Sequence, residues 1–141
     1  MPGAALEEWS QINKVSETEL AEDTSKWDLP RPLSVFKKNV PAFSFTGLRT
    51  AVEQVVEKSE MTVEERMSLG RVAQVLVFEH VAQKCVLGIR MGGDQMGGSL
   101  VVSGGVACNM AFRTTYFPLA PQVLTLDCAE HWIALTWKIL R

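Results

Sequence analysis

Apolar residues in the middle of the chain recur at helical spacing over two separate stretches. In residues 47–57 they fall every three or four positions, which is typical of one face of an amphipathic helix. Ser44 or Thr46 is placed to supply the capping oxygen at its start. A longer helix is predicted over residues 62–91, because Thr62 opens a Thr-x-x-Glu capping box and a glycine pair follows the last apolar position.

The first third of the chain is polar and then rich in proline. Residues 1–28 are acidic, and Ser16 with Glu19 has the spacing of another capping box, which predicts a short helix. Several prolines follow within residues 29–45. Because proline restricts its own backbone and that of the preceding residue, this stretch is predicted to be extended chain with loops.

The last third changes to extended patterns. Residues 99–103 are apolar and β-branched at their centre, which predicts a short buried strand. Residues 106–109 follow a glycine pair and can open a helix. A second strand is predicted over residues 122–126, and residues 131–141 form a mostly apolar tail. The glycine pairs around residues 92–98 match neither the dinucleotide-binding nor the Walker spacing, so they predict a plain connecting loop.

Length, charge and cysteine content limit the classes of protein to consider. A chain of 141 residues has room for one domain. No apolar run approaches the ~20 residues that cross a bilayer, so no membrane association is expected. The three cysteines include no Cys-x-x-Cys pair, which favours a reduced, intracellular protein. The net charge of −2 gives no general attraction to nucleic acid, so such a role would require a local patch or a partner subunit.

The segment from Val102 to Asn109 carries the strongest chemical signal. A strand leads to paired glycines, whose missing side chains let a ligand approach the backbone. The helix that starts next directs its N–H groups and positive dipole end to the same place, which suits a phosphate or carboxylate. Asn109, one turn into this helix, offers both a donor and an acceptor. The same turn also occurs as a purely structural connection, and both interpretations stay open.

Four motifs together resemble the tRNA adenosine threonylcarbamoyltransferase family, once called O-sialoglycoprotein endopeptidases. Residues 103–109, Ser-Gly-Gly-Val-Ala-Cys-Asn, resemble its C-terminal nucleotide-site motif. Residues 43–52, Phe-Ser-Phe-Thr-Gly-Leu-Arg-Thr-Ala-Val, are similar to its Phe-Ser-Phe-Ser-Gly-Leu-Lys-Thr-Ala-Val signature. Residues 29–32 and 2–7 resemble its Phe-Pro-Arg-Pro and Pro-Gly-Gly-Pro-x-Leu-Glu segments. The residues of these motifs are similar to those of the family's bacterial and mitochondrial branch. This resemblance implies a mitochondrial location or, alternatively, the bacterial cytoplasm.

The resemblance implies an α/β fold: a partial actin-like ATPase fold, in which helices of the C-terminal lobe pack on a few strands. Residues 1–28 would then be a partial, polar N-terminal segment. Residues 29–141 would be the C-terminal portion of the domain, with the first lobe absent and residues 128–141 atypical. A sugar kinase or chaperone of the actin-like class would share the glycine pair but not the Phe-Ser-Phe-Thr-Gly-Leu run.

The activity implied is transfer of threonylcarbamoyl from threonylcarbamoyl-adenylate to the exocyclic amine of an adenosine. That adenosine lies next to the anticodon in tRNAs that read codons starting with A. The resemblance also implies tRNA and threonylcarbamoyl-adenylate as partners and a homodimer in the full-length form. It identifies no catalytic residue. The residues implied in substrate binding are Asn109, Ser103, Gly104, Gly105, Phe45 and Gly47.

The family's metal site is the main departure from the pattern. Relatives hold one iron or zinc ion per full-length subunit with an upstream His-x-x-x-His, which this chain lacks. Glu130 stands where relatives have a metal-binding aspartate, and Trp132 replaces a glycine. Cys128 and His131 are too close to Glu130 to share a metal without a distant fourth ligand. The chain alone is therefore expected to be inactive; the alternative is a non-catalytic truncated isoform that binds a nucleotide or partner.

Overall fold

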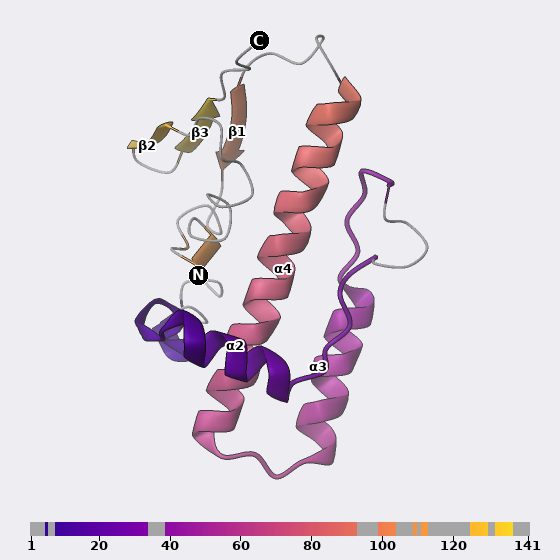
Figure 1. Ribbon diagram of the computed structural model, residues 1–141, viewed down its shortest axis with the longest axis vertical. Coiled ribbons are helices and arrows are strands. Elements are labelled where there is room, and N and C mark those ends of the chain that lie inside the picture. The colour runs from indigo at the N-terminus through magenta and orange to yellow at the C-terminus, as the bar shows by residue number, and fades with distance from the viewer. Residues whose placement is uncertain are drawn as a thin grey trace.

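The computed structural model describes residues 5, 8–33, 39–92, 99–103, 109, 111–112, 125–129 and 132–136, the strands by their backbone only. A long helix forms the axis, and the other elements lie along it (Figure 1). In chain order the elements are η1 (Ile12–Lys14), α2 (Glu17–Lys26), α3 (Thr46–Lys58), α4 (Val63–Gly92), β1 (Ser99–Ser103), β2 (Thr125–Ala129) and β3 (Trp132–Thr136).

The long helix α4 confirms the sequence prediction within a residue at each end. The capping box is formed: the Glu65 backbone N–H donates to Thr62 Oγ1 at 3.2 Å, and the Thr62 N–H donates to Glu65 Oε2 at 3.1 Å. Two interactions lower the pKa of the Glu65 carboxyl. The larger is the hydrogen bond from the Thr62 backbone N–H, and the second is the ion pair with Lys26. The start of α4 is therefore held by its own side chains.

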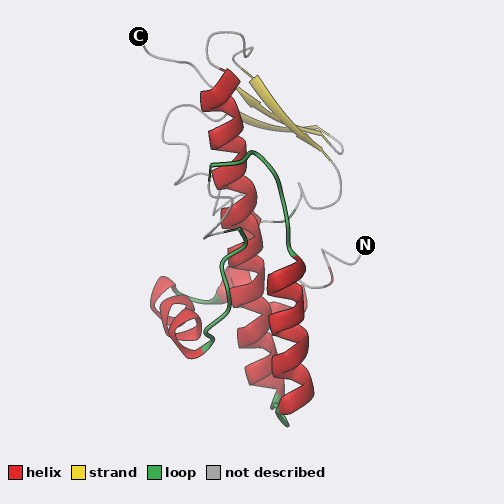
Figure 2. Ribbon diagram, turned by 90° about the vertical axis from the view of Figure 1, so that its right-hand side faces the viewer, coloured by secondary structure: helices red, strands yellow, loops and turns green. Residues whose placement is uncertain are grey.

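Two clusters of apolar side chains pack on different sides of α4. Near its start, α3 and the chain after α2 pack against it, and α3 runs alongside it in both views (Figures 1 and 2). Burying each leucine of this cluster stabilises the fold by roughly 1.5–3 kcal/mol. The buried members of this first cluster are Leu29, Leu48, Leu69, Val72 and Leu76. The buried members of the second, further along α4, are Ile12, Phe78, Ala82, Ala111 and Phe112.

Helix α4 corrects the prediction that no segment is apolar enough to cross a bilayer. By length and composition alone it could span a membrane, a test that core helices of soluble proteins also pass. Here α2 and α3 both pack against it.

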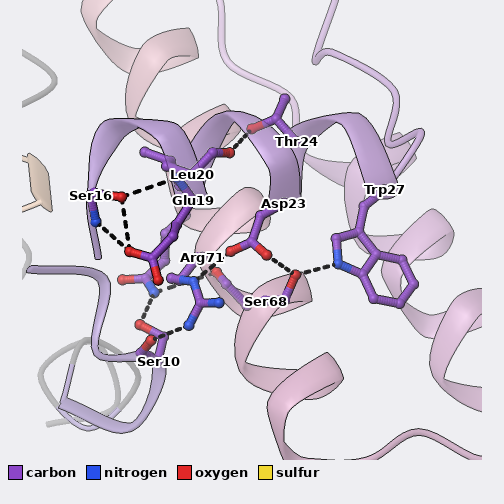
Figure 3. A network of polar contacts seen from close by, with 11 residues as sticks. Ser10, Ser16, Glu19, Leu20, Asp23, Thr24, Trp27, Ser68 and Arg71 are labelled. Carbon is purple, nitrogen blue, oxygen red and sulfur yellow. Dashed lines mark hydrogen bonds and ion pairs between the residues drawn. The ribbon is translucent and has the colours of Figure 1, made fainter. Parts of the chain in front are cut away.

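Helix α2 is attached to α4 through polar side chains rather than apolar ones (Figure 3). Its predicted capping box between Ser16 and Glu19 is confirmed. Asp23 accepts hydrogen bonds from Arg71 Nε at 2.6 Å and from Ser68 Oγ at 2.5 Å, and Trp27 Nε1 donates to Ser68 Oγ at 2.7 Å. The polar N-terminal segment is thus fixed to the central helix by a half-buried network.

The start of α3 differs from the prediction. The helix covers residues 46–58, close to the predicted 47–57, but Phe45 occupies the N-cap position and no side chain caps the helix. Neither Ser44 nor Thr46 therefore acts as the expected cap. The ring of Phe45 packs against His80 of α4, so a tertiary contact holds the residue from which the chain enters the helix.

The three strands form one antiparallel sheet beside the C-terminal half of α4, with the order β1-β3-β2 (Figures 1 and 2). Strand β1 matches the prediction for residues 99–103, whereas the strand predicted at 122–126 lies at 125–129. A further strand, β3, lies within the apolar tail. Its Trp132 is the direct cross-strand neighbour of Ser103. The actin-like assignment of this arrangement stays a prediction.

Candidate functional site

The predicted nucleotide turn begins where β1 ends, at Ser103. Gly104 and Gly105, expected to shape the turn, lie outside the described residues, as does the predicted helix opening up to residue 108. Asn109 is buried, with 4% of its surface exposed. Of residues 103–109, the predicted turn and helix start, the structure therefore describes Ser103 and Asn109.

Asn109 precedes its helix instead of lying one turn inside it, which corrects the sequence prediction. Its side-chain Oδ1 accepts a hydrogen bond from the Phe112 backbone N–H at 3.0 Å, and residues 111–112 are helical. This is the bond of an N-cap residue, a position where asparagine is strongly favoured. The side-chain oxygen of Asn109 thus holds the start of the helix, and the contact of Asn109 with a ligand stays a prediction.

The start of this helix is anchored to α4. The rings of Phe112 and Phe78 make an edge-to-face contact with centroids 5.2 Å apart and an interplanar angle of 73°. Ala111 is buried in the same cluster. Such aromatic contacts add to the apolar burial and fix orientation, so Asn109 is positioned by the core of the molecule.

The Phe-Ser-Phe-Thr-Gly motif packs elsewhere on α4. The rings of Phe43 and Phe45 each make an edge-to-face contact with the ring of His80, with centroid separations of 6.1 and 5.5 Å. Gly47 lies exposed in the first turn of α3, and an added β-carbon would meet no atom within 4 Å. Within the described residues, no steric contact requires glycine at position 47.

Phe45 and Asn109 lie on opposite sides of α4. Phe78 and His80 are two positions apart, so their side chains leave the helix about 200° apart. Phe78 contacts the helix that Asn109 caps, whereas His80 contacts Phe45. Within the described residues, Phe45 and Asn109, which the resemblance implies in substrate binding, therefore do not lie together.

A pocket of about 280 Å³ lies between the chain at residues 31–33 and one side of α4. His80 lines it, with 3% of its surface exposed and no hydrogen-bond partner for its Nε2 in the described part of the chain. A histidine within a long helix is expected at the surface or fully hydrogen-bonded, whereas His80 is buried and its Nε2 is unpaired within the described residues. The four-residue spacing of His80 and Lys84 indicates that they share one side of the helix. Nothing in the sequence predicts that residues 31–33 pack opposite them.

Burial, and secondarily the positive charge of Lys84, lowers the pKa of His80 and favours its neutral form. Lys84 is itself 6% exposed, and its Nζ donates to the carbonyl oxygen of Val40 at 2.9 Å. Arg31 and Glu79 form an ion pair of 2.7 Å on the same pocket. The ammonium group of Lys84 and the Arg31–Glu79 ion pair thus both lie on the lining of this pocket.

The described residues do not fit the metal ion that the resemblance implies. No three histidine, cysteine, aspartate or glutamate side chains among them lie close enough to hold a metal. His80 faces the ammonium group of Lys84, which disfavours a bound cation. Glu130, the predicted ligand, lies outside the described residues.

The chain is similar to bacterial proteins named tRNA N6-adenosine threonylcarbamoyltransferase. It is 34% identical to the protein of Francisella philomiragia over 99 residues, which cover 68% of this chain and 27% of that protein. It is 30% identical to the protein of Bradyrhizobium diazoefficiens over 125 residues, 82% of this chain and 34% of that protein. The Bordetella pertussis protein is 33% identical over 96 residues, 64% of this chain and 26% of its own length. No family model and no solved structure matches.

These similarities show the class of protein. The chain is related to transferases whose name states that they modify an adenosine of tRNA. The chain belongs to the tRNA N6-adenosine threonylcarbamoyltransferase family. It spans about a quarter to a third of the length of the relatives it matches.

Proposed function

We propose that this chain supplies part of an acyltransferase that modifies tRNA. The complete enzyme would transfer threonylcarbamoyl from threonylcarbamoyl-adenylate to the exocyclic amine of the adenosine next to the anticodon. The observation that carries this proposal is the similarity to several relatives with that name across 64–82% of the chain. The capped helix start after β1 supports it, because such a start is suited to the phosphate of an adenylate.

In this proposal the residues between β1 and Phe112 position the adenylate. Attack by the adenosine amine on the carbamoyl carbon would expel AMP, so catalysis would rest on alignment and on stabilising the leaving phosphate. Helix N–H groups would supply that stabilisation. Asn109 is then a positioning residue, because its cap bond holds the first turn of the helix that presents those groups.

Further parts of the proposal concern the complete protein. We infer that it is a homodimer in the mitochondrion or the bacterial cytoplasm. Its iron or zinc ion would be held by residues outside those described.

A non-catalytic nucleotide- or partner-binding module is the second candidate. It is favoured by the register of the sheet, which places Trp132 directly across from Ser103 where the family has a glycine. This tryptophan is a departure from the family on the strand that pairs with the one leading into the proposed turn. The two candidates differ in whether the chain can take the place of its counterpart in a working enzyme.

The test is a chimera in which this chain replaces the matching part of the Francisella philomiragia protein. Chimera and the 141-residue chain are each incubated with tRNA and threonylcarbamoyl-adenylate, and modified adenosine is measured. We expect modification by the chimera and none by the chain alone. A folded chimera that binds the adenylate without modifying tRNA would reject the acyltransferase proposal in favour of the binding module.

A further inference from the structure

The pocket between residues 31–33 and α4 combines apolar side chains with one buried polar ring. Pro32, Leu33 and Leu76 line it together with the imidazole of His80. Its volume of about 280 Å³ is at the lower limit of sites that take small organic molecules. The pocket therefore has the size for a ligand of only a few non-hydrogen atoms.

His80 is held by two aromatic rings, while its Nε2 has no partner among the described residues. The rings of Phe43 and Phe45 each contact the imidazole edge-to-face, at centroid separations of 6.1 and 5.5 Å. Only 3% of the residue is exposed, and its Nε2 makes no hydrogen bond within the described part of the chain. Buried polar atoms are paired in most proteins, so an unpaired one calls for a ligand or an ordered water.

A hydroxyl is the ligand group that suits this atom best. Burial lowers the pKa of His80 and so favours the neutral imidazole, whose Nε2 either carries the proton and donates or has a lone pair and accepts. A hydroxyl can pair with both forms, because it is a donor and an acceptor at once. A carboxylate or an ammonium group can pair with only one of them, and it would give up its hydration for a bond to a neutral ring.

The Arg31–Glu79 ion pair on the lining is closed, since its atoms are 2.7 Å apart. We propose that this pocket binds a small neutral alcohol, whose hydroxyl pairs with His80 Nε2 and whose short apolar body packs on the apolar residues of the lining. That hydrogen bond needs no charge from the rest of the lining. The site lies on the side of α4 opposite Asn109, so the binding does not depend on the proposed acyl transfer.

Nuclear magnetic resonance of the histidine rings tests the proposal on the 141-residue chain. The sequence has two histidines, so a protein labelled with ¹⁵N-histidine gives two ring spin systems, and the His80→Gln variant assigns them. The probe is 2-propanol, titrated in parallel with dimethyl sulfide, whose sulfur is only a weak acceptor, and with sodium acetate, which is charged. We expect a saturable shift of the His80 Nε2 signal with 2-propanol, and weaker binding of both the sulfide and the acetate.

Three variants separate the hydrogen bond from general binding of an alcohol to apolar surface, with affinities measured from the ligand signals. His80→Phe keeps an aromatic ring but no hydrogen-bonding group, and it should weaken 2-propanol binding about fivefold, the net contribution of one neutral hydrogen bond. His80→Gln keeps a donor and an acceptor, so it should bind more tightly than His80→Phe. Val63→Ser removes an apolar side chain that is 61% exposed at the start of α4, and it should leave binding unchanged.

Three results on the unaltered chain would each overturn the inference: no saturable shift of His80, equal binding of dimethyl sulfide and 2-propanol, or tighter binding of acetate than of 2-propanol. The first of these would leave an ordered water as the partner of Nε2. Unchanged 2-propanol binding in a folded His80→Phe variant would also overturn it, as would equal losses with phenylalanine and glutamine. If circular dichroism shows that His80→Phe is unfolded, the comparison of the three ligands on the unaltered chain decides.

Discussion

Replacing Asp23 with alanine should destabilise the fold severely, because it removes the acceptor at the centre of the network between α2 and α4. Asp23 and Arg71 have side chains that are only 15% and 13% exposed. The change breaks the 2.6 Å bond from Arg71 and the 2.5 Å bond from Ser68, and it leaves a largely buried guanidinium without its carboxylate (Figure 3). Trp27 loses the ordered Ser68 hydroxyl to which it donates.

The expected loss is about 3 kcal/mol in the free energy of unfolding, at the lower end for breaking a buried ion pair. The lower end applies because Arg71 keeps its bond to the Ser10 carbonyl oxygen at 3.1 Å. Arg71→Ala should cost a similar amount, and the double variant should show a coupling of about 1–3 kcal/mol. Urea unfolding followed by circular dichroism measures all three variants.

The exposed ion pair between Arg49 and Glu53 provides the matched control. Its atoms are 2.7 Å apart, but the side chains are 78% and 51% exposed. Glu53→Ala should leave the unfolding midpoint unchanged, because solvent-exposed pairs contribute little. The reasoning would be refuted if Asp23→Ala unfolded at the same urea concentration as Glu53→Ala, or if the Asp23 and Arg71 effects were simply additive.

Three further predictions concern α3 and α4. Ala82→Leu should lower the unfolding free energy by about 1–3 kcal/mol in urea titrations, because Ala82 is fully buried, whereas Gln83→Leu on the exposed side should not. Gly47→Ala should raise it by about 0.5–1 kcal/mol, since the β-carbon meets nothing within 4 Å in a helical turn; a loss of stability would show a contact that the described residues lack. The lowered pKa of His80 means that the unfolded chain binds a proton first, so stability should be full above the ordinary pKa of about 6.5 and fall as the pH drops below it. His80→Gln should flatten that pH dependence, and an equal slope in both proteins would contradict the burial argument.

Local signals in the sequence predicted the helices well. The capping boxes at Ser16 and Thr62 each satisfy backbone donors within four residues, so their formation depends on nearby atoms alone. The β-branched run of residues 99–103 also predicted β1, although this strand pairs with the distant β3. The entry to α3 could not be predicted in this way, because the position of Phe45 depends on a ring 35 residues further along the chain.

The candidate site was predicted in part. The motif at residues 103–109 indicated a strand that ends before a helix, and the described residues contain both the end of β1 and the cap at Asn109. The role of Asn109 could not be read from its residue type, since an asparagine can cap a helix or contact a ligand equally well. Likewise, the burial of His80 depends on residues 31–33 and on the rings of Phe43 and Phe45, which pack on α4 from a distance in sequence.

The most direct test of the account is the amount of threonylcarbamoyladenosine formed by the chimera, measured by mass spectrometry of digested tRNA. Two variants of Asn109 are compared in the same assay: Asn109→Ser, which can still cap the helix, and Asn109→Ala, which cannot. The account predicts modification by the chimera, near-full modification with serine, and a loss of about fivefold or more with alanine. A folded chimera that leaves the adenosine unmodified would contradict the proposed function, and equal losses with serine and alanine would contradict the role of Asn109 as a cap.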